Sequence, residues 1–330
     1  MTNDTKQTIT LGKTGPTVHA LGLGCMGMSG MYGATDDAES VATIQAAIDA
    51  GVTLIDTGDF YGMGHNERLI GRAIAGRRDK VQLSVKFGAL RGPDGSWVGV
   101  DTRPAAIKNF LSYSLDRLGV SYIDIYRPAR LDPNVPIEEV VGVLAELVKA
   151  GYIRHIGLSE VGVETIRRAQ KIAPIADLQI EYSLASRAPE AQIFPALREM
   201  GIGATLYGIF SRGLFAGSKP NGPRDFRAYL PRFASENQST NDATVAALQK
   251  FAREHEMSVG QLAISWARAR QPQLLPLIGA KTRAQLADAL VALDKPLSAS
   301  DVAAVEAIAD GGIAGTRYGA DHMRHLDSER

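Results

Sequence analysis

Short apolar runs alternate with helix-like patterns of apolar and polar residues from residue 21 almost to the end of the chain. Most of the runs lack strict alternation, which is typical of parallel strands covered on both faces. We predict eight strands, at residues 21–24, 54–56, 82–86, 122–126, 153–159, 176–181, 203–207 and 274–278. We predict helices after them, at residues 37–50, 66–75, 103–118, 137–150, 163–171 and 189–200, from 240, and at 282–290.

Local signals mark the ends of these helices. Pro104 lies in the first turn of one helix, where its missing N–H costs no hydrogen bond, and Asp101 and Thr102 offer capping side chains. A left-handed residue commonly ends a helix and favours glycine. Glycine follows four of the predicted helices, at Gly51, Gly119, Gly151 and Gly201.

Eight strand–helix units without a charge-rich linker predict one closed (β/α)8 barrel domain over residues 1–330, with a doubly wound sheet as the alternative. Residues 7–20 are expected to form a small hairpin with its turn at 12–15, closing the bottom of the barrel. The stretch 208–241, rich in Gly, Pro, Ser and Asn, predicts a long loop after the seventh strand. Loops of this length are usually functional.

Residues 22–27 match the G-x-G-x-x-G pattern of dinucleotide-binding folds and follow a strand. That motif requires a helix to begin inside it, so that the helix N-terminus meets the pyrophosphate. Here the helix begins only near Asp37, and no strand-end acid follows at the required distance. We therefore interpret these glycines as allowing close backbone approach at the mouth of the first strand.

Composition and charge exclude several classes of function. Lys plus Arg and Asp plus Glu both number 36, so the formal net charge is zero, which argues against a nucleic-acid or acidic-membrane partner. The single cysteine, Cys25, excludes an internal disulfide and a cysteine-rich metal site, and we predict no metal. A polar start without a signal-peptide core, and no apolar run of about 18 residues, favour a soluble, cytoplasmic protein.

Functional groups of such barrels lie at the carboxyl ends of the strands. Those ends carry Asp56, Tyr61, Lys86, Ser159, Glu160, Gln179, Tyr207 and residues 279–281. Five segments around them occur in a specific order and spacing: IDTGDFYG at 55–62, VK at 85–86, LGVSYID at 118–124, IGLS at 156–159 and LPLIGA at 275–280. In these segments the chain resembles the aldo-keto reductases over nearly its whole length.

The resemblance implies a catalytic group of three residues. Tyr61 would be the general acid that protonates a carbonyl oxygen as hydride arrives. A free tyrosine has a pKa of about 10, and Lys86 as a nearby cation would lower it. Asp56 would hold Lys86 in place and charged. The expected reaction is the reversible reduction of an aldehyde or ketone.

The cofactor site follows from the same resemblance. Residues 282–285 form a T-x-x-Q capping box at a helix start, which favours an anion, and Lys281 and Arg283 flank it. The family places the adenosine 2′-phosphate there, which implies NADPH. Tyr207 would stack on the nicotinamide, Ser159 and Gln179 would bind its carboxamide, and Arg212 would reach the pyrophosphate. The remaining expected cofactor contacts are Gly24, Met26, Gly279 and Gln285.

The chain departs from the family pattern at the end of the fourth strand, where Ala129 stands in place of the usual histidine. His65, the one histidine placed near the mouth, is expected to belong to the turn before Asn66, which can cap its helix. Further departures are Glu160, Ala289 and the pair at 208–209. They affect the expected substrate and cofactor affinity more than the fold.

Strand alternation would place Arg127 just below Ala129, inside the barrel. A buried guanidinium requires a carboxylate partner, and Glu181 is the candidate. Arg127 or an ordered water would supply part of the polarity that the histidine normally provides.

Two other functions stay open. A cofactor-binding regulatory or partner-binding protein on the same fold is favoured by the missing histidine, and an aldolase-like barrel would use Lys86 as a Schiff base. The expected partner is a small carbonyl or alcohol substrate, and the oligomeric state is not predicted. Its pocket would be lined by Trp97, Tyr32, Phe60 and residues 227–233.

Overall fold

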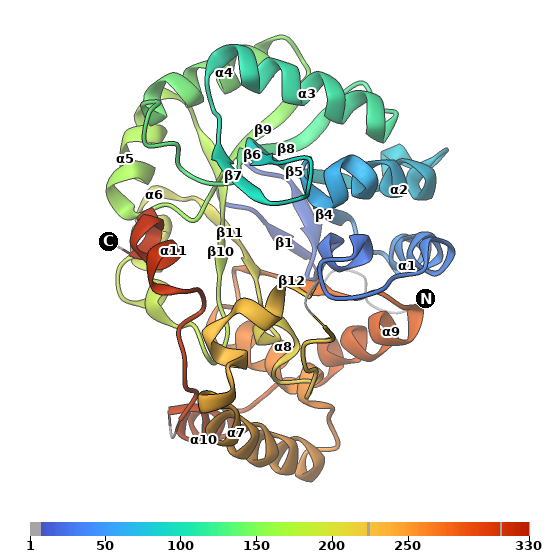
Figure 1. Ribbon diagram of the computed structural model, residues 1–330, viewed down its shortest axis with the longest axis vertical. Helices are drawn as coiled ribbons and strands as arrows, with labels where there is room; N and C mark the ends of the chain where they lie inside the picture. Colours follow the sequence, from blue (N-terminus) through green and yellow to red (C-terminus); the bar gives the residue numbers. More distant parts are fainter. Residues whose placement is uncertain (1–7, 223–224, 311, 330) are drawn as a thin grey trace.

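A computed structural model describes residues 8–222, 225–310 and 312–329, so Gln7, where the expected hairpin begins, lies outside the described residues. The centre is a closed barrel of eight parallel strands that follow one another in chain order (Figure 1). They are β3 (Gly22–Gly24), β4 (Leu54–Gly58), β5 (Gln82–Phe87), β8 (Ile123–Pro128), β9 (Ile153–Ser159), β10 (Ile175–Glu181), β11 (Gly203–Tyr207) and β12 (Leu275–Gly279). The predicted (β/α)8 fold is confirmed, and the doubly wound sheet is wrong.

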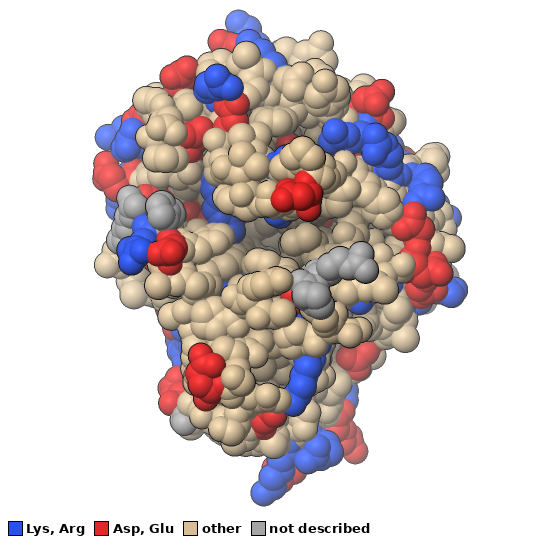
Figure 2. All heavy atoms as spheres, in the orientation of Figure 1, with Lys and Arg blue, Asp and Glu red and all other residues tan. Residues whose placement is uncertain are grey.

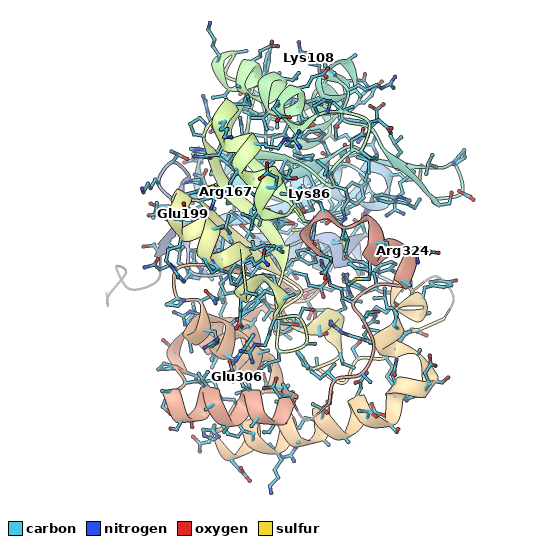
Figure 3. All side chains as sticks on the ribbon, turned by 90° about the vertical axis from the view of Figure 1, so that its left-hand side faces the viewer. Lys86, Lys108, Arg167, Glu199, Glu306 and Arg324 are labelled. Carbon is cyan, nitrogen blue, oxygen red and sulfur yellow. The ribbon has the colours of Figure 1, made fainter. Side chains whose placement is uncertain are left out.

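Helices surround this barrel, because each crossover between parallel strands returns along its outside. They are α1 (Asp37–Asp49), α2 (His65–Ile74), α3 (Pro104–Leu118), α4 (Ile137–Lys149), α5 (Val163–Ile172), α6 (Ile193–Met200), α7 (Ser235–Glu254), α8 (Val259–Arg270), α9 (Arg283–Val291) and α10 (Ala299–Asp310). Figure 3 shows Lys86 inside this ring and Lys108, on α3, at its outside. The expected left-handed glycines are present, for example Gly119 after α3 at φ +66°.

The bottom of the barrel is closed by an antiparallel hairpin of β1 (Thr8–Thr10) and β2 (Thr17–His19). Leu11 and Val18, both fully buried, pack against apolar side chains at the lower ends of the barrel strands: Leu54, Ile125, Leu275 and Leu277. The hairpin therefore forms a plug under the barrel, as the sequence predicts.

Several element boundaries and one helix cap differ from the prediction. β8 continues to Pro128, two residues beyond the expected end, and α7 begins at Ser235 instead of 240. The residue before α3 is Arg103, whose side chain makes no cap, so the expected capping by Asp101 or Thr102 is wrong. Asp101 instead accepts bonds from Arg103, and Thr102 donates to Asp132.

Three segments overlie the open end of the barrel. One is a hairpin of β6 (Ala89–Arg91) and β7 (Trp97–Val100), which the sequence analysis did not predict. The second is the loop after β11, which contains short 3-10 turns at Ser211–Gly213, Phe226–Tyr229 and Pro231–Phe233. The third follows α10 and includes α11 (Ala320–His325). Among the described residues, no helix has both the length and the apolar character needed to cross a membrane.

Candidate active site

Asp56 and Lys86 lie side by side inside the barrel mouth because their strands, β4 and β5, are neighbours. The Lys86 Nζ donates to Asp56 Oδ1 at 2.6 Å, and both side chains are buried. Asp56 Oδ2 accepts two further bonds, from Ser84 Oγ at 2.8 Å and from Gln179 Nε2 at 2.7 Å. Asp56 is thus held by three donors, and it fixes the position of the Lys86 ammonium.

Tyr61 follows β4 and lies against the same ammonium. Its ring centroid is 5.1 Å from Lys86 Nζ, and its side chain is 7% exposed. The turn after Tyr61 favours glycine at position 62, where φ is +56° and a Cβ atom would lie 3.0 Å from the Ser29 Cβ. The Asp59 amide donates to Lys86 O at 2.9 Å and ties the turn to β5. The structure therefore brings together the three residues predicted to be catalytic.

The electrostatics at Tyr61 differ from the sequence-based expectation. Burial and then the Asp56 carboxylate raise the pKa of Tyr61 well above its usual range, and the cation that opposes them is Arg130. Burial also lowers the pKa of Lys86, against the opposing effect of Asp56. A lowered tyrosine pKa is therefore not what the structure shows. The raised pKa favours the protonated form of Tyr61, which a general acid requires.

Ala129 directly follows β8 and is buried, with its amide donating to Phe87 O at 2.8 Å. His65 does not take the place of the missing histidine. Its ring bonds to Ser29 Oγ at 2.9 Å and to Asp37 at 3.1 Å, and His65 is the first residue of α2, so its expected place in the turn before the helix is wrong. Asn66 does not cap α2, which begins one residue earlier, and instead donates to Cys25 O.

Arg127 points into the barrel, as alternation predicts, but its partner is Asp177 and not Glu181. The closest nitrogen–oxygen distance of this pair is 3.0 Å, and both side chains are completely buried. Arg127 also donates to Ser84 Oγ at 2.9 Å. Because the guanidinium is engaged inside the barrel, Arg127 is not available to supply polarity at Ala129.

The residues expected to hold the nicotinamide end of a cofactor lie on adjacent strands. Ser159 and Gln179 are register partners on β9 and β10. The Ser159 hydroxyl is buried and has no hydrogen-bond partner, whereas the Gln179 amide already donates to Asp56. Gly24 and Met26 lie partly buried at the end of β3.

The residues expected at the phosphates lie at the start of α9. Thr282 caps this helix by accepting from the Gln285 amide at 3.2 Å. The capping box is incomplete, because the Gln285 side chain accepts from Lys281 N and not from Thr282 N. Arg283 is exposed and forms a bidentate pair with Glu39, and Lys281 Nζ donates to Tyr32 O at 3.2 Å. Gly279, just before this turn, is exposed.

An ion-pair network that the sequence did not predict lies on the opposite side of the mouth. Arg317 forms a bidentate pair with Glu160, at 2.9 and 2.6 Å, and Glu160 also accepts from Tyr207 OH at 2.8 Å. Burial would raise the pKa of Glu160, but Arg317 and further donors hold it at about 2. Arg212 and Arg232 both pair with Glu181, which is buried.

This network follows from contacts distant in sequence, which a single sequence cannot reveal. Residues 160 and 317 are 157 positions apart.

Local signals existed only for the β6–β7 hairpin, where Asp-Gly at 94–95 lies between two short apolar runs. Gly95 has the positive φ, +80°, that such a turn requires.

The expected pocket residues fall on two sides of the mouth. Phe60 packs edge-on against Tyr61, and Arg91 lies over both Phe60 and Trp97. On the other side, Arg227 lies over Tyr32. Figure 2 shows a hollow near the middle of this face, with basic side chains along its wall. The lining of the pocket stays a prediction.

Comparison with known proteins shows the family of the chain. The sequence pattern of the aldo/keto reductase family matches residues 20–310. The chain belongs to the aldo/keto reductase family. A probable aldo-keto reductase 1 from Glycine max is 38% identical over 334 residues, 98% of this chain and 95% of the relative. An NADP(+) aldo-keto reductase from Schizosaccharomyces pombe is 37% identical over 314 residues, 92% of each chain.

Solved structures of other family members share this fold. A glycerol dehydrogenase from Gluconobacter oxydans superposes with a TM-score of 0.83 at 28% identity, covering 98% of this chain and 97% of that one. An aldo/keto reductase from Klebsiella pneumoniae, in complex with NADP and acetate, has a TM-score of 0.74 at 26% identity, covering 95% and 99%. This aldo/keto reductase is therefore an oxidoreductase of a family that uses a nicotinamide cofactor.

Proposed function

We propose that the protein catalyses the NADPH-dependent reduction of an aldehyde or ketone to the alcohol, with Tyr61 as the proton donor. The observation that carries the proposal is the buried group of Tyr61, Lys86 and Asp56 at the mouth of the barrel. Burying the Lys86–Asp56 ion pair costs desolvation free energy that apolar residues of similar volume would avoid, so stability alone does not account for it. Such arrangements concentrate at functional sites.

Each residue has a separate task in this reaction. The hydroxyl of Tyr61 would donate its proton to the carbonyl oxygen, and its high pKa keeps that proton available. Lys86 would stabilise the negative charge that remains on the phenolate. Asp56 positions Lys86, while Ser84 and Gln179 position Asp56. In the reverse direction the phenolate would accept the proton of the alcohol.

The residues present fit a nicotinamide cofactor. When bound, its reduced ring supplies the hydride. The buried Ser159 hydroxyl, which has no partner, could donate to the carboxamide beside Gln179. The amide groups at the start of α9, with Lys281 and Arg283, could bind a 2′-phosphate. Tyr207 and Arg212 are expected at the nicotinamide ring and the pyrophosphate, from positions where they now contact Glu160 and Glu181.

Ala129 in place of the usual histidine favours a second candidate, a regulatory protein on this fold that binds NADPH with little turnover. One experiment separates the two. The protein is mixed with NADPH and a panel of aldehydes and ketones, and the absorbance of the reduced cofactor is followed. Turnover of any substrate supports the reductase. Tight NADPH binding without turnover supports the regulatory protein, and substrate cleavage without NADPH oxidation would indicate the aldolase-like use of Lys86.

Cofactor preference depends on the cations at the start of α9. In wild type we expect tighter binding of NADPH than of NADH. Replacing both Lys281 and Arg283 with alanine should weaken NADPH binding about 10- to 100-fold, because charge-assisted bonds to the 2′-phosphate are lost. NADH binding should stay nearly unchanged. Cofactor fluorescence titration measures both dissociation constants, and equal values in wild type would contradict this assignment.

The alanine at position 129 affects substrate size. We expect wild type to accept bulkier ketones than a family member with histidine there, because alanine leaves side-chain volume free. Ala129→His should raise the kcat/KM of a small aldehyde relative to a bulky cyclic ketone about tenfold. An unchanged ratio in a variant with the wild-type melting curve would show that residue 129 does not line the pocket.

A further inference from the structure

Arg130 is the residue after Ala129, and it differs from the buried arginines of the barrel and its mouth. Its Nη1 donates to Ala129 O at 2.7 Å, and its Nη2 donates to Tyr318 OH at 3.3 Å. Both acceptors are neutral. The Arg130 Nε is buried and has no hydrogen-bond partner. Within the described part of the chain, no carboxylate lies within ion-pair distance of Arg130.

The other buried arginines show what this position lacks. Each has a carboxylate partner: Arg127 pairs with Asp177, Arg212 and Arg232 with Glu181, and Arg317 with Glu160. A guanidinium in a site of low dielectric requires such compensation, and its planar fork matches a carboxylate. Arg130 therefore has no direct carboxylate partner among the described residues, and Glu160, which pairs with Arg317, acts on its charge only from beyond ion-pair distance.

The position of Arg130 connects this charge to the reaction. The main chain of Ala129 bonds to Phe87 O, next to Lys86 in β5, so Arg130 leaves the barrel beside the catalytic group. On its other side, the Tyr318 hydroxyl lies 3.3 Å from the Tyr207 hydroxyl. Arg130 thus spans from the end of β8 to the segment after α10, close enough to Tyr61 for its charge to oppose the rise of the Tyr61 pKa.

We propose that Arg130 determines substrate specificity by pairing with a carboxylate on the carbonyl substrate, so that this enzyme prefers oxo acids and carboxylated aldehydes. The proposal rests on the proposed reductase function and adds the substrate class to it. Alanine at position 129 has no side-chain group that would compete for the guanidinium, which bonds to its main-chain oxygen. The free Nε and an Nη would form the two donors of a bidentate contact.

Matched aldehydes test this proposal. 3- and 4-Formylbenzoate are compared with 3- and 4-formylbenzamide, which have nearly the same shape but no charge. Wild type should show a kcat/KM at least about tenfold higher for one of the acids than for its amide, mainly through KM. Arg130→Met should abolish that ratio, and Arg130→Lys should restore part of it. The KM of the amides should be similar in all three proteins, and any effect of Arg130 on Tyr61 should change kcat for acids and amides alike.

Two controls separate specificity from structure and from cofactor binding. Arg103→Met removes one positive charge from an exposed side chain of the same molecule and should leave the acid-to-amide ratio unchanged. The dissociation constant of NADPH should be the same in Arg130→Met and wild type. If Arg130→Met does not fold, Arg130→Gln replaces it, and the acid-to-amide ratio of kcat/KM in wild type is tested by itself.

The results have distinct meanings. Equal kcat/KM for acids and amides in wild type would overturn the proposal while leaving the reductase intact. So would an Arg130→Met variant that loses both substrates equally, or one in which NADPH binding weakens, since Arg130 would then contact the cofactor. Failure of wild type to oxidise NADPH with any of the four aldehydes would instead count against the proposed function.

Discussion

Replacing Tyr61 with phenylalanine should lower the turnover of carbonyl reduction about 10²- to 10⁴-fold. The ring and its contacts with Phe60 and Lys86 remain, but the proton that reaches the carbonyl oxygen is lost. Binding of NADPH should persist. Single-turnover kinetics under saturating cofactor measure the chemical step directly. Near wild-type turnover with chemistry rate-limiting would rule out Tyr61 as the acid.

The pH dependence gives an independent check on the same residue. Because burial raises the pKa of Tyr61, the acid form required for reduction persists through neutral pH. Reduction should therefore stay flat up to about pH 10, the usual tyrosine pKa, and fall only at higher pH. Alcohol oxidation requires the phenolate and should rise with pH. A reduction rate that falls between pH 6 and 8 would show that another group supplies the proton.

Replacing Arg127 with leucine should destabilise the protein by about 3–5 kcal/mol, because it leaves the Asp177 carboxylate buried without a partner. Both side chains are completely inaccessible to solvent, so water cannot compensate the charge. Urea denaturation monitored by circular dichroism measures the free energy of unfolding. The double variant Arg127→Leu with Asp177→Leu should recover much of the loss, because neither charge then remains in the core. Equal loss in the single and double variants would show that packing, not charge, is responsible.

The same pair shows how far a sequence predicts a barrel interior. Alternation along β8 correctly directs Arg127 inward, but it cannot say which level of β10 the side chain reaches. Asp177, Gln179 and Glu181 all share one face of that strand. The deciding residue is Gly157 on β9, where a Cβ atom would lie 2.9 Å from Asp177 Oδ1 and 3.1 Å from Arg127 Cζ. A glycine inside a strand is a signal of such close approach.

The functional residues at the strand ends could be predicted from the sequence, whereas the ion pairs around them could not. Asp56, Lys86 and Gln179 meet because parallel strands place their carboxyl ends at one rim, a property of the fold class. Tyr61 follows from the turn after β4. By contrast, Glu160 and Arg317 meet only after the whole chain has folded, and no periodicity marks them. The direction of the Tyr61 pKa also depends on burial, which one sequence does not give.

The plug formed by β1 and β2 closes the lower end of the barrel, so the described structure opens at the carboxyl ends of its strands. Leu11 and Val18 fill its lower end, so no route leads through the barrel axis. Every molecule that reaches Tyr61 must pass the rim where the β6–β7 hairpin, the loop after β11 and the segment after α10 lie, and must leave by the same way. Because bound molecules share this one exit, they leave in a fixed order. A molecule bound deeper in the barrel is therefore released after a molecule bound nearer the rim.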